Sequence, residues 1–220
     1  MPAKQLNSAP RRAGVALTVR RLHAGPKAIS EAARVVKSGG VVAIPTDTVY
    51  GLGCDPSNDE AVGKLFEAKN RQAKPVPVLC ASPHVANRLV ELNSAAADLA
   101  NLHWPGPLTI VAPLKKGSKL SGLLDQGSGY LGVRVPRSDL CLELARKVGG
   151  SITGTSANLS GQPSCRTAAQ VVASLDDKIE LVIDGGTLRG KESTVVKASG
   201  ETVEVLREGS VRIQEGKQKP

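Results

Sequence analysis

The fold is decided by one stretch of the chain, Gly39-Gly-Val-Val-Ala-Ile-Pro-Thr-Asp-Thr-Val-Tyr-Gly-Leu-Gly53. Residues 41–44 form a short apolar run rich in β-branched side chains, which predicts a buried strand. Pro45 has no amide hydrogen and therefore ends the ladder pairing of that strand. Two hydroxyls, a carboxylate and two glycines follow. Small polar groups after a strand can form a ligand crevice, and they can equally form an ordinary glycine turn.

Predicted helices and strands alternate irregularly along the rest of the chain. Helices are expected over 27–36, from Asn58 or Asp59 onward, and over 83–92, 94–103, 138–148 and 167–175. Strands are expected over 15–22, 76–80, 109–112, 131–135, 151–153, 179–183, 193–197 and 202–207, with a loop over 115–129. This order favours an α/β fold with a mixed sheet and flanking helices over a doubly wound parallel sheet.

The length of 220 residues fits one domain with tails. We expect a disordered basic tail over residues 1–14, a catalytic domain over 15–212 and a frayed end over 213–220. Aromatic residues make up only 2% of the chain, which argues against recognition of single-stranded RNA by base stacking. The formal net charge of +9 favours an anionic partner, either nucleic acid or a polyphosphate, or reflects a basic tail and a solvated face.

The four cysteines form no Cys-x-x-Cys pair and have no zinc-ligand spacing with a histidine, so they are expected to be reduced thiols. We assign no metal site made of protein ligands. No apolar run reaches the length of a membrane-spanning helix, so no membrane partner is expected. The expected location is cytoplasmic. The acid-poor, arginine-rich beginning leaves a mitochondrial presequence as the alternative.

Three cations, Lys69, Arg71 and Lys74, lie where a helix runs into a proline-flanked loop. Convergent cations there could clamp a triphosphate, although these cations taken alone are better explained as a solvated helix end. Arg134 stands in an otherwise apolar strand that ends at Pro136, which favours a buried anion ligand. Nucleotide binding needs such a device, because the chain has neither a Walker A loop nor a complete dinucleotide fingerprint.

A second candidate phosphate site follows a strand at Gly154-Thr-Ser-Ala-Asn158. Its backbone amides and the Ser156 hydroxyl could bind phosphate, whereas the bland alternative is a turn or helix cap. Covalent catalysis is disfavoured, because Cys54 has no histidine near it in sequence and Ser156 lacks a Gly-x-Ser-x-Gly elbow.

Taken in order, these motifs resemble the YrdC-like family. The matching segments are Pro45-Thr-Asp-Thr-Val-Tyr-Gly-Leu-Gly53, Ala68-Lys-Asn-Arg71, Trp104-Pro-Gly-Pro-Leu-Thr109, Val133-Arg-Val-Pro136, Thr155-Ser-Ala-Asn158, Asp184-Gly-Gly186, Glu192-Ser-Thr194 and Arg207-x-Gly209. The resemblance covers nearly all of residues 15–211 and is to the short, single-domain form. It implies a twisted mixed sheet with flanking helices and a large concave basic cleft.

The resemblance also implies an activity, the synthesis of threonylcarbamoyl-AMP and pyrophosphate from L-threonine, bicarbonate or CO2, and ATP with Mg²⁺. A partner transferase would then pass the threonylcarbamoyl group to adenosine 37 of tRNA. Lys69 and Arg71 would hold the ATP phosphates as the catalytic cations. The implied threonine ligands are Thr46, Arg134, Gly154 and Ser193, and the further nucleotide ligands are Ser156, Asn158, Ser164 and Arg207.

Two alternatives stay open at this point. A non-catalytic module of the same fold could bind double-stranded RNA or tRNA, and a related module could adenylate a carbamoyl group in hydrogenase maturation. Two positions also depart from many relatives, since Gln72 replaces a proline and Gly154-Thr155 replaces Ala-Pro. These departures put the placement of Lys74 and the side-chain contacts of Thr155 in question.

Overall fold

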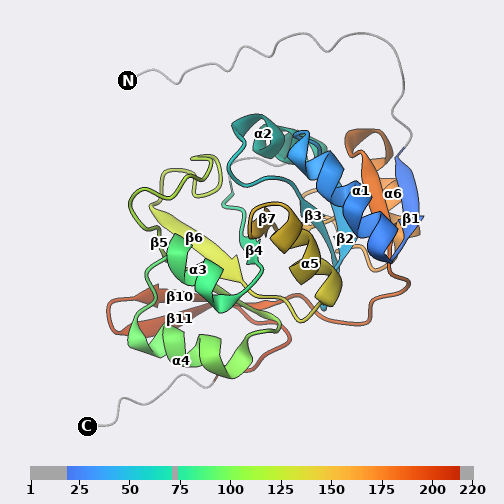
Figure 1. Cartoon of the computed structure of the whole chain (residues 1–220). Coiled ribbons are helices and arrows are strands. Elements are labelled where there is room, and N and C mark those ends of the chain that lie inside the picture. The colour runs from blue at the N-terminus through green and yellow to red at the C-terminus, as the bar shows by residue number, and fades with distance from the viewer. Residues whose placement is uncertain (1–18, 71–73, 214–220) are drawn as a thin grey trace.

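The computed structural model describes residues 19–70 and 74–213, and Figure 1 shows their arrangement. The predicted tail at 1–14, most of the frayed end at 213–220 and Arg71 lie outside the described residues. The helices are α1 Pro26–Lys37, α2 Asp59–Ala68, α3 Pro83–Leu89, α4 Ser94–His103, α5 Asp139–Lys147 and α6 Ala168–Leu175, followed by the 3-10 turn η1 Asp176–Lys178. The strands are β1 Arg20–His23, β2 Val42–Pro45, β3 Tyr50–Gly53, β4 Val78–Cys80, β5 Leu108–Pro113, β6 Tyr130–Arg134, β7 Ser151–Thr153, β8 Thr155–Ser156, β9 Leu181–Asp184, β10 Thr194–Ser199 and β11 Thr202–Arg207.

The strands divide into two mixed sheets, where the sequence predicted one. The five-stranded sheet has the order β1-β9-β2-β3-β8 and the six-stranded sheet the order β11-β10-β5-β6-β4-β7. Both contain parallel pairs, such as β2 with β9 and β5 with β10, and antiparallel pairs, such as β2 with β3 and β5 with β6. The mixed α/β class is therefore confirmed. Which strands share a sheet depends on pairings between distant segments, which local patterns do not specify.

The glycine-rich half of the opening stretch is a strand and not a simple turn. Its residues form β3, which runs back along β2 with Pro45 opposite Tyr50 and Val42 opposite Gly53. A Cβ on Gly53 would lie 2.5 Å from Cδ1 of Ile152, so this strand has room for backbone alone. β8 pairs with the other edge of β3 and brings Ser156 opposite Gly51. The stretch is thus a hairpin whose turn, residues 46–49, carries the polar groups.

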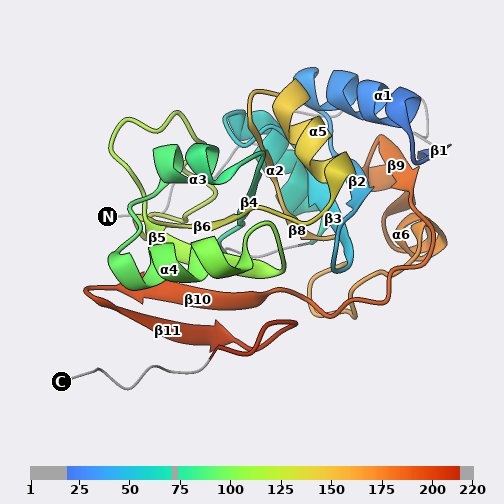
Figure 2. The same cartoon turned by 60° about the horizontal axis from the view of Figure 1, so that its bottom comes forward.

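Alternate residues of β2 enter two different core clusters, as the period of two in a strand requires. Val42 and Ile44 pack with α1 and α5 on one side of the sheet, and Val41 and Ala43 pack with α2 and α6 on the other. Figure 1 shows α1 and α5 side by side across the five-stranded sheet, and Figure 2 shows α4 against β10 of the other sheet. Both faces of β2 are therefore covered, which explains its uninterrupted apolar run.

Most of the described helices begin where the sequence provides a capping side chain, whereas α1 begins with Pro26 and has no side-chain cap. Asn58, Ser82, Ser138 and Thr167 each accept a hydrogen bond from an amide in the first turn of the helix that follows. The helix predicted over 83–92 ends early, at Leu89, because Val90 forms a β-bridge with Leu114. None of the helices in residues 19–70 and 74–213 has the length and apolar character needed to cross a membrane.

Candidate active site

A cavity of about 640 Å³ lies between the two sheets. Residues of β3 and β8 line one wall, and residues of β5, β6, β10 and β11 line the other. Eight of the ten predicted site residues line this cavity: Thr46, Arg134, Gly154, Ser156, Asn158, Ser164, Ser193 and Arg207. They come from segments up to 161 positions apart along the chain (207 − 46), so folding brings residues that are distant in sequence to one cavity.

The turn between β2 and β3 is held by its own hydroxyls. Thr46 Oγ1 donates to the carbonyl of Val49 at 2.7 Å and accepts from the amide of Thr48 at 3.0 Å. The two threonine hydroxyls are 2.9 Å apart. Because the Thr46 hydrogen is engaged on Val49, Thr48 is the donor between them. The Thr46 hydroxyl therefore uses its hydrogen and both of its lone pairs to hold the turn.

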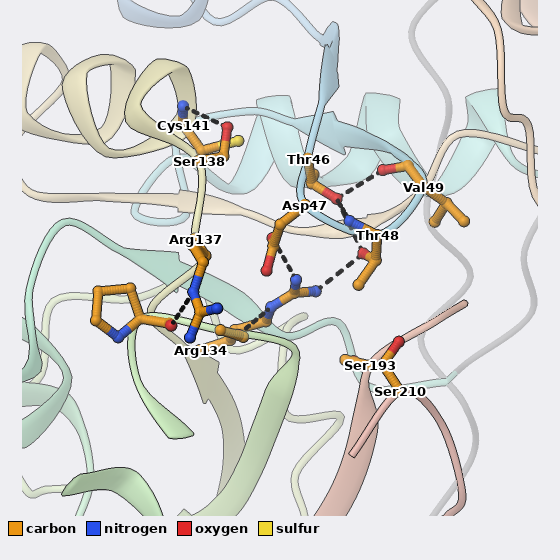
Figure 3. Close-up of polar contacts among 12 residues, drawn as sticks. Thr46, Asp47, Thr48, Val49, Arg134, Arg137, Ser138, Cys141, Ser193 and Ser210 are labelled. Carbon is orange, nitrogen blue, oxygen red and sulfur yellow. Dashed lines mark hydrogen bonds and ion pairs between the residues drawn. The ribbon is translucent and has the colours of Figure 1, made fainter. Parts of the chain in front are cut away.

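Arg134, at the end of β6, reaches across the cavity to this turn (Figure 3). Its NH2 lies 2.5 Å from Asp47 Oδ1, its NH1 donates to Thr48 Oγ1 at 3.2 Å and its Nε donates to the carbonyl of Gly106 at 3.0 Å. The side chains of the ion pair are only 7% and 11% exposed. The prediction that Arg134 is buried is confirmed, and its partner in the structure is a carboxylate of the protein.

A chain of hydrogen bonds joins β5, β10 and β11 on the opposite wall. Ser193 Oγ lies 2.9 Å from Thr109 Oγ1, and Arg207 donates to the Ser193 carbonyl at 2.8 Å and to its hydroxyl at 3.2 Å.

The cavity also holds acidic side chains. Glu192, next to Ser193, accepts hydrogen bonds from its own backbone amide and from Ser164, and these bonds lower its pKa. Glu192 and Glu208 line the cavity with the two arginines, so its charged groups are of both signs. The concave basic cleft stays a prediction.

Directly after β7, Gly154 packs closely against β4 and has no room for a side chain. The amide of Gly154 donates to the carbonyl of Pro77 at 2.8 Å, and a Cβ on Gly154 would lie 2.4 Å from Cγ of Leu79. Asn158 then turns its Nδ2 toward the carbonyls of Leu159 and Gln162, at 2.8 and 2.6 Å. Those two acceptors fix the orientation of the side-chain amide.

Lys69 is buried beneath this segment, with only 1% of its surface exposed. Its ammonium donates to the carbonyls of Ser156 and Asn158, the latter at 2.7 Å. It does not line the cavity in this conformation, so its predicted contact with ATP phosphates stays a prediction. Lys74 is exposed, Arg71 lies outside the described residues, and the convergence of the three cations stays a prediction.

Sequence reasoning assigned no role to three residues of the site: Asp47, Thr109 and Glu192. Asp47 stood in the opening stretch as one carboxylate among polar groups, and its pairing with Arg134 joins positions 87 apart. Thr109 was seen only as the start of a strand. Its side-chain contact with Ser193 follows from the parallel pairing of β5 with β10, which no local pattern predicts.

Within residues 19–70 and 74–213, no group of three or more His, Cys, Asp or Glu side chains is placed to hold a metal ion. The four cysteines are buried and unpaired with one another. Burial raises the pKa of Cys54, Cys80 and Cys141 to about 12, so each thiol is protonated at neutral pH. The site as described consists of cations, carboxylates, hydroxyls and backbone, which suits binding and charge neutralisation.

The chain is similar in sequence to a known protein family. The family Sua5/YciO/YrdC, described as telomere recombination, matches residues 34–209. A threonylcarbamoyl-AMP synthase of Idiomarina loihiensis is 37% identical over 163 residues, which are 71% of this chain and 86% of that relative. A threonylcarbamoyl-AMP synthase of Bacillus subtilis is 37% identical over 83% of this chain, which spans about half (54%) of that longer protein.

Solved structures agree with these relatives. The crystal structure of P. abyssi Sua5 complexed with L-threonine superposes with a TM-score of 0.80 at 36% identity, over 87% of this chain and 57% of that one. E. coli YciO superposes with a TM-score of 0.78 at 24% identity, over 87% of this chain and 95% of that one, and shares the fold.

Proposed function

Since the chain belongs to the Sua5/YciO/YrdC family, we propose that it is an L-threonylcarbamoyladenylate synthase. Its substrates are L-threonine, bicarbonate or CO2, and ATP, and its products are threonylcarbamoyl-AMP and pyrophosphate. The observation that carries the proposal is the convergence of eight scattered residues on one cavity. The threonine bound to P. abyssi Sua5, a relative at 36% identity, supports the choice of amino acid.

Threonine binds at the end of the cavity next to the turn after β2. Arg134 pairs with the α-carboxylate there, because a guanidinium recognises a carboxylate through two parallel N–H groups. Ser193 offers a hydroxyl there, the turn with Thr46 forms the facing wall, and Gly154 lets the backbone approach closely. These are short, directional contacts that hold a small zwitterion in one orientation.

ATP binds along the neighbouring wall. Ser156, Asn158 and Ser164 line it, and Arg207 closes it from the end of β11. Lys69 fixes the backbone of Ser156 and Asn158 from beneath. Arg71, which lies outside the described residues, is expected to contact the ATP phosphates. Mg²⁺ would be held mainly by the ATP phosphates and would neutralise their charge, and the carboxylates of Glu192 and Glu208 would be oxygen ligands suited to such a hard cation.

The chemistry requires positioning more than an enzymic nucleophile. The amine of threonine combines with CO2 to give a carbamate, a carbamate oxygen attacks the α-phosphorus of ATP, and pyrophosphate leaves. Such a displacement is accelerated by alignment of the reacting atoms and by cations placed where negative charge develops. A cavity lined by arginines, hydroxyls and close backbone provides that environment.

The decisive experiment incubates the protein with ATP, bicarbonate and labelled L-threonine and follows the release of pyrophosphate. We expect release that requires both threonine and bicarbonate, together with a labelled adenylate. ATP turnover that is independent of threonine would exclude the synthase. Arg207→Ala serves as the matched variant and should raise the KM for ATP. Because Arg207 also donates to the carbonyl and hydroxyl of Ser193, the free energy of unfolding of this variant is measured beside its kinetics.

The product serves a transferase complex that modifies adenosine 37 of tRNA, and the proposed location is the cytoplasm. A non-catalytic module for double-stranded RNA or tRNA remains the competing function, favoured by the net charge of +9. Such a module would bind RNA with strong salt dependence and release no pyrophosphate. Pyrophosphate release in the incubation described above therefore distinguishes the synthase from the RNA-binding module.

A further inference from the structure

Two hydroxyls on one wall of the cavity are hydrogen-bonded to each other. Thr109 Oγ1 on β5 and Ser193 Oγ, just before β10, lie 2.9 Å apart, and both residues line the cavity. Thr109 is 4% exposed and Ser193 is 6% exposed, so both hydroxyls are largely withdrawn from solvent. The proposed function assigns a ligand contact to Ser193 and none to Thr109, although the two hydroxyls form one pair.

This pair carries one hydrogen more than it uses. Each hydroxyl has one hydrogen, and a single hydrogen lies between the two oxygens. Either oxygen can be its donor. Among residues 19–70 and 74–213, neither hydroxyl has a second acceptor within hydrogen-bond distance. Whichever hydroxyl donates to the other, the remaining hydrogen is therefore available to a molecule in the cavity.

Arg207 strengthens the pair as a donor. Its NH2 donates to Ser193 Oγ at 3.2 Å and so occupies one lone pair of that oxygen. A hydroxyl that accepts from a cation becomes a better donor, because hydrogen bonds in a chain polarise one another. A guanidinium next to an available hydroxyl hydrogen favours an anionic oxygen and disfavours an ammonium group.

We propose that Thr109 and Ser193 act as one hydrogen-bond donor for a carboxylate-type oxygen of the amino-acid substrate, which makes Thr109 a further substrate-binding residue. The inference rests on the proposed function, under which two such groups exist. One is the α-carboxylate of threonine, and the other is the carbamate that CO2 forms on its nitrogen. Both groups are anions that accept hydrogen bonds, so both suit the hydroxyl pair and the charge of Arg207.

Calorimetry without ATP tests the pair and separates the two groups. L-threonine is titrated in buffer freed of CO2, where only the α-carboxylate is present, and in buffer with bicarbonate, where the carbamate forms. Thr109→Val keeps the branched shape and removes the hydroxyl. We expect binding about ten-fold weaker than in the wild type, as for the loss of a hydrogen bond to a charged group. A loss in both buffers identifies the α-carboxylate, and a loss confined to bicarbonate identifies the carbamate.

The second signature is coupling between the two hydroxyls. Ser193→Ala should weaken threonine binding by a similar factor, because each hydroxyl alone lacks the partner that orients it. The double variant should lose only about two-fold more, since the pair supplies a single hydrogen to the ligand. Thr109→Ser restores a hydroxyl and should restore most of the affinity. Losses that multiply in the double variant would reveal two independent contacts and would overturn the inference.

Ser121→Ala is the control for loss of a buried hydroxyl. Ser121 is 5% exposed, accepts the amide of Leu123 at 3.2 Å and does not line the cavity, so its loss should leave threonine affinity unchanged. Urea denaturation accompanies each titration, and Thr109→Ala replaces the valine variant if valine prevents folding. Wild-type affinity of Thr109→Val in both buffers, or a change confined to the KM for ATP, overturns the inference alone. Wild-type protein that binds threonine in neither buffer overturns the proposed function as well.

Discussion

At the scale of single residues, the site depends on places where a side chain would not fit. Gly154 presents bare backbone to the cavity, and its amide is held by the carbonyl of Pro77. A Cβ at this position would lie 2.4 Å from Cγ of Leu79 and 2.7 Å from Cδ2. Leu79 is itself buried, so it has little space into which it can retreat. The same close approach brings backbone to the surface of the cavity.

Gly154→Ala is therefore expected to destabilise the protein by about 1–3 kcal/mol, the usual cost of overpacking a filled core. Urea denaturation measures the free energy of unfolding, and threonine binding should weaken in the same variant. Gly63→Ala is the control, since a Cβ on Gly63 in α2 meets nothing within 4 Å. That change should be neutral or stabilising by up to about 1 kcal/mol. Equal losses in both variants would contradict the steric explanation.

At the scale of elements, the start of α6 anchors the loop that carries Ser164. Thr167 accepts the amide of Gln170 at 3.2 Å, and Gln170 Oε1 accepts the amides of Arg166 and Thr167 at 2.7 and 3.2 Å. This reciprocal cap satisfies donors that would otherwise be exposed at the helix end. The carbonyl of Cys165 then binds the amide of Tyr50 at 3.0 Å, which ties the loop to β3.

Thr167→Ala should lower the free energy of unfolding by about 1 kcal/mol, because it removes the cap. We further expect a raised KM for ATP, since the loop with Ser164 loses its anchor. Thermal unfolding and steady-state kinetics provide the two measurements. Ser174→Ala lies within the same helix and away from its start, so both quantities should stay near the wild-type values. A fall in stability with no change in KM would show that the cap does not act on the site.

At the scale of the whole molecule, the thiols lie in its apolar interior. Desolvation raises the pKa of Cys54, Cys80 and Cys141 to about 12 and raises that of Cys165 as well. In the unfolded chain a thiol ionises near its ordinary pKa of 9.0. Below that pH both states are protonated and the thiols leave stability unchanged. As the pH rises from 9 toward 12, only the unfolded state loses protons, so stability falls.

We expect the free energy of unfolding to drop between pH 8 and pH 10 by about 1 kcal/mol for each such thiol. Lysines and tyrosines also titrate in this range, so the comparison that isolates one thiol is wild type against Cys80→Ala. Urea denaturation at both pH values should show a drop that is smaller in the variant by about 1 kcal/mol. Identical drops would mean that Cys80 ionises as readily in the folded protein as in the unfolded chain.

The sequence by itself determined the local elements and the composition of the site. Short apolar runs marked β2 and β9, side chains at 58, 138 and 167 marked helix starts, and ordered motifs named eight residues that line the cavity. These signals are local because they depend on the repeat of a strand or helix and on a cap within one turn. These local signals do not depend on how distant parts of the chain pack.

Tertiary structure alone decided which strands share a sheet, that the glycines after the turn form β3, and which polar groups meet. Asp47 meets Arg134, Ser193 meets Arg207, and Lys69 turns to two carbonyls beneath the site. Each contact links residues that lie 14 to 89 positions apart and depends on how buried surfaces pack. A buried charge takes the partner that the folded interior offers, and that partner exists only once the sheets have come together.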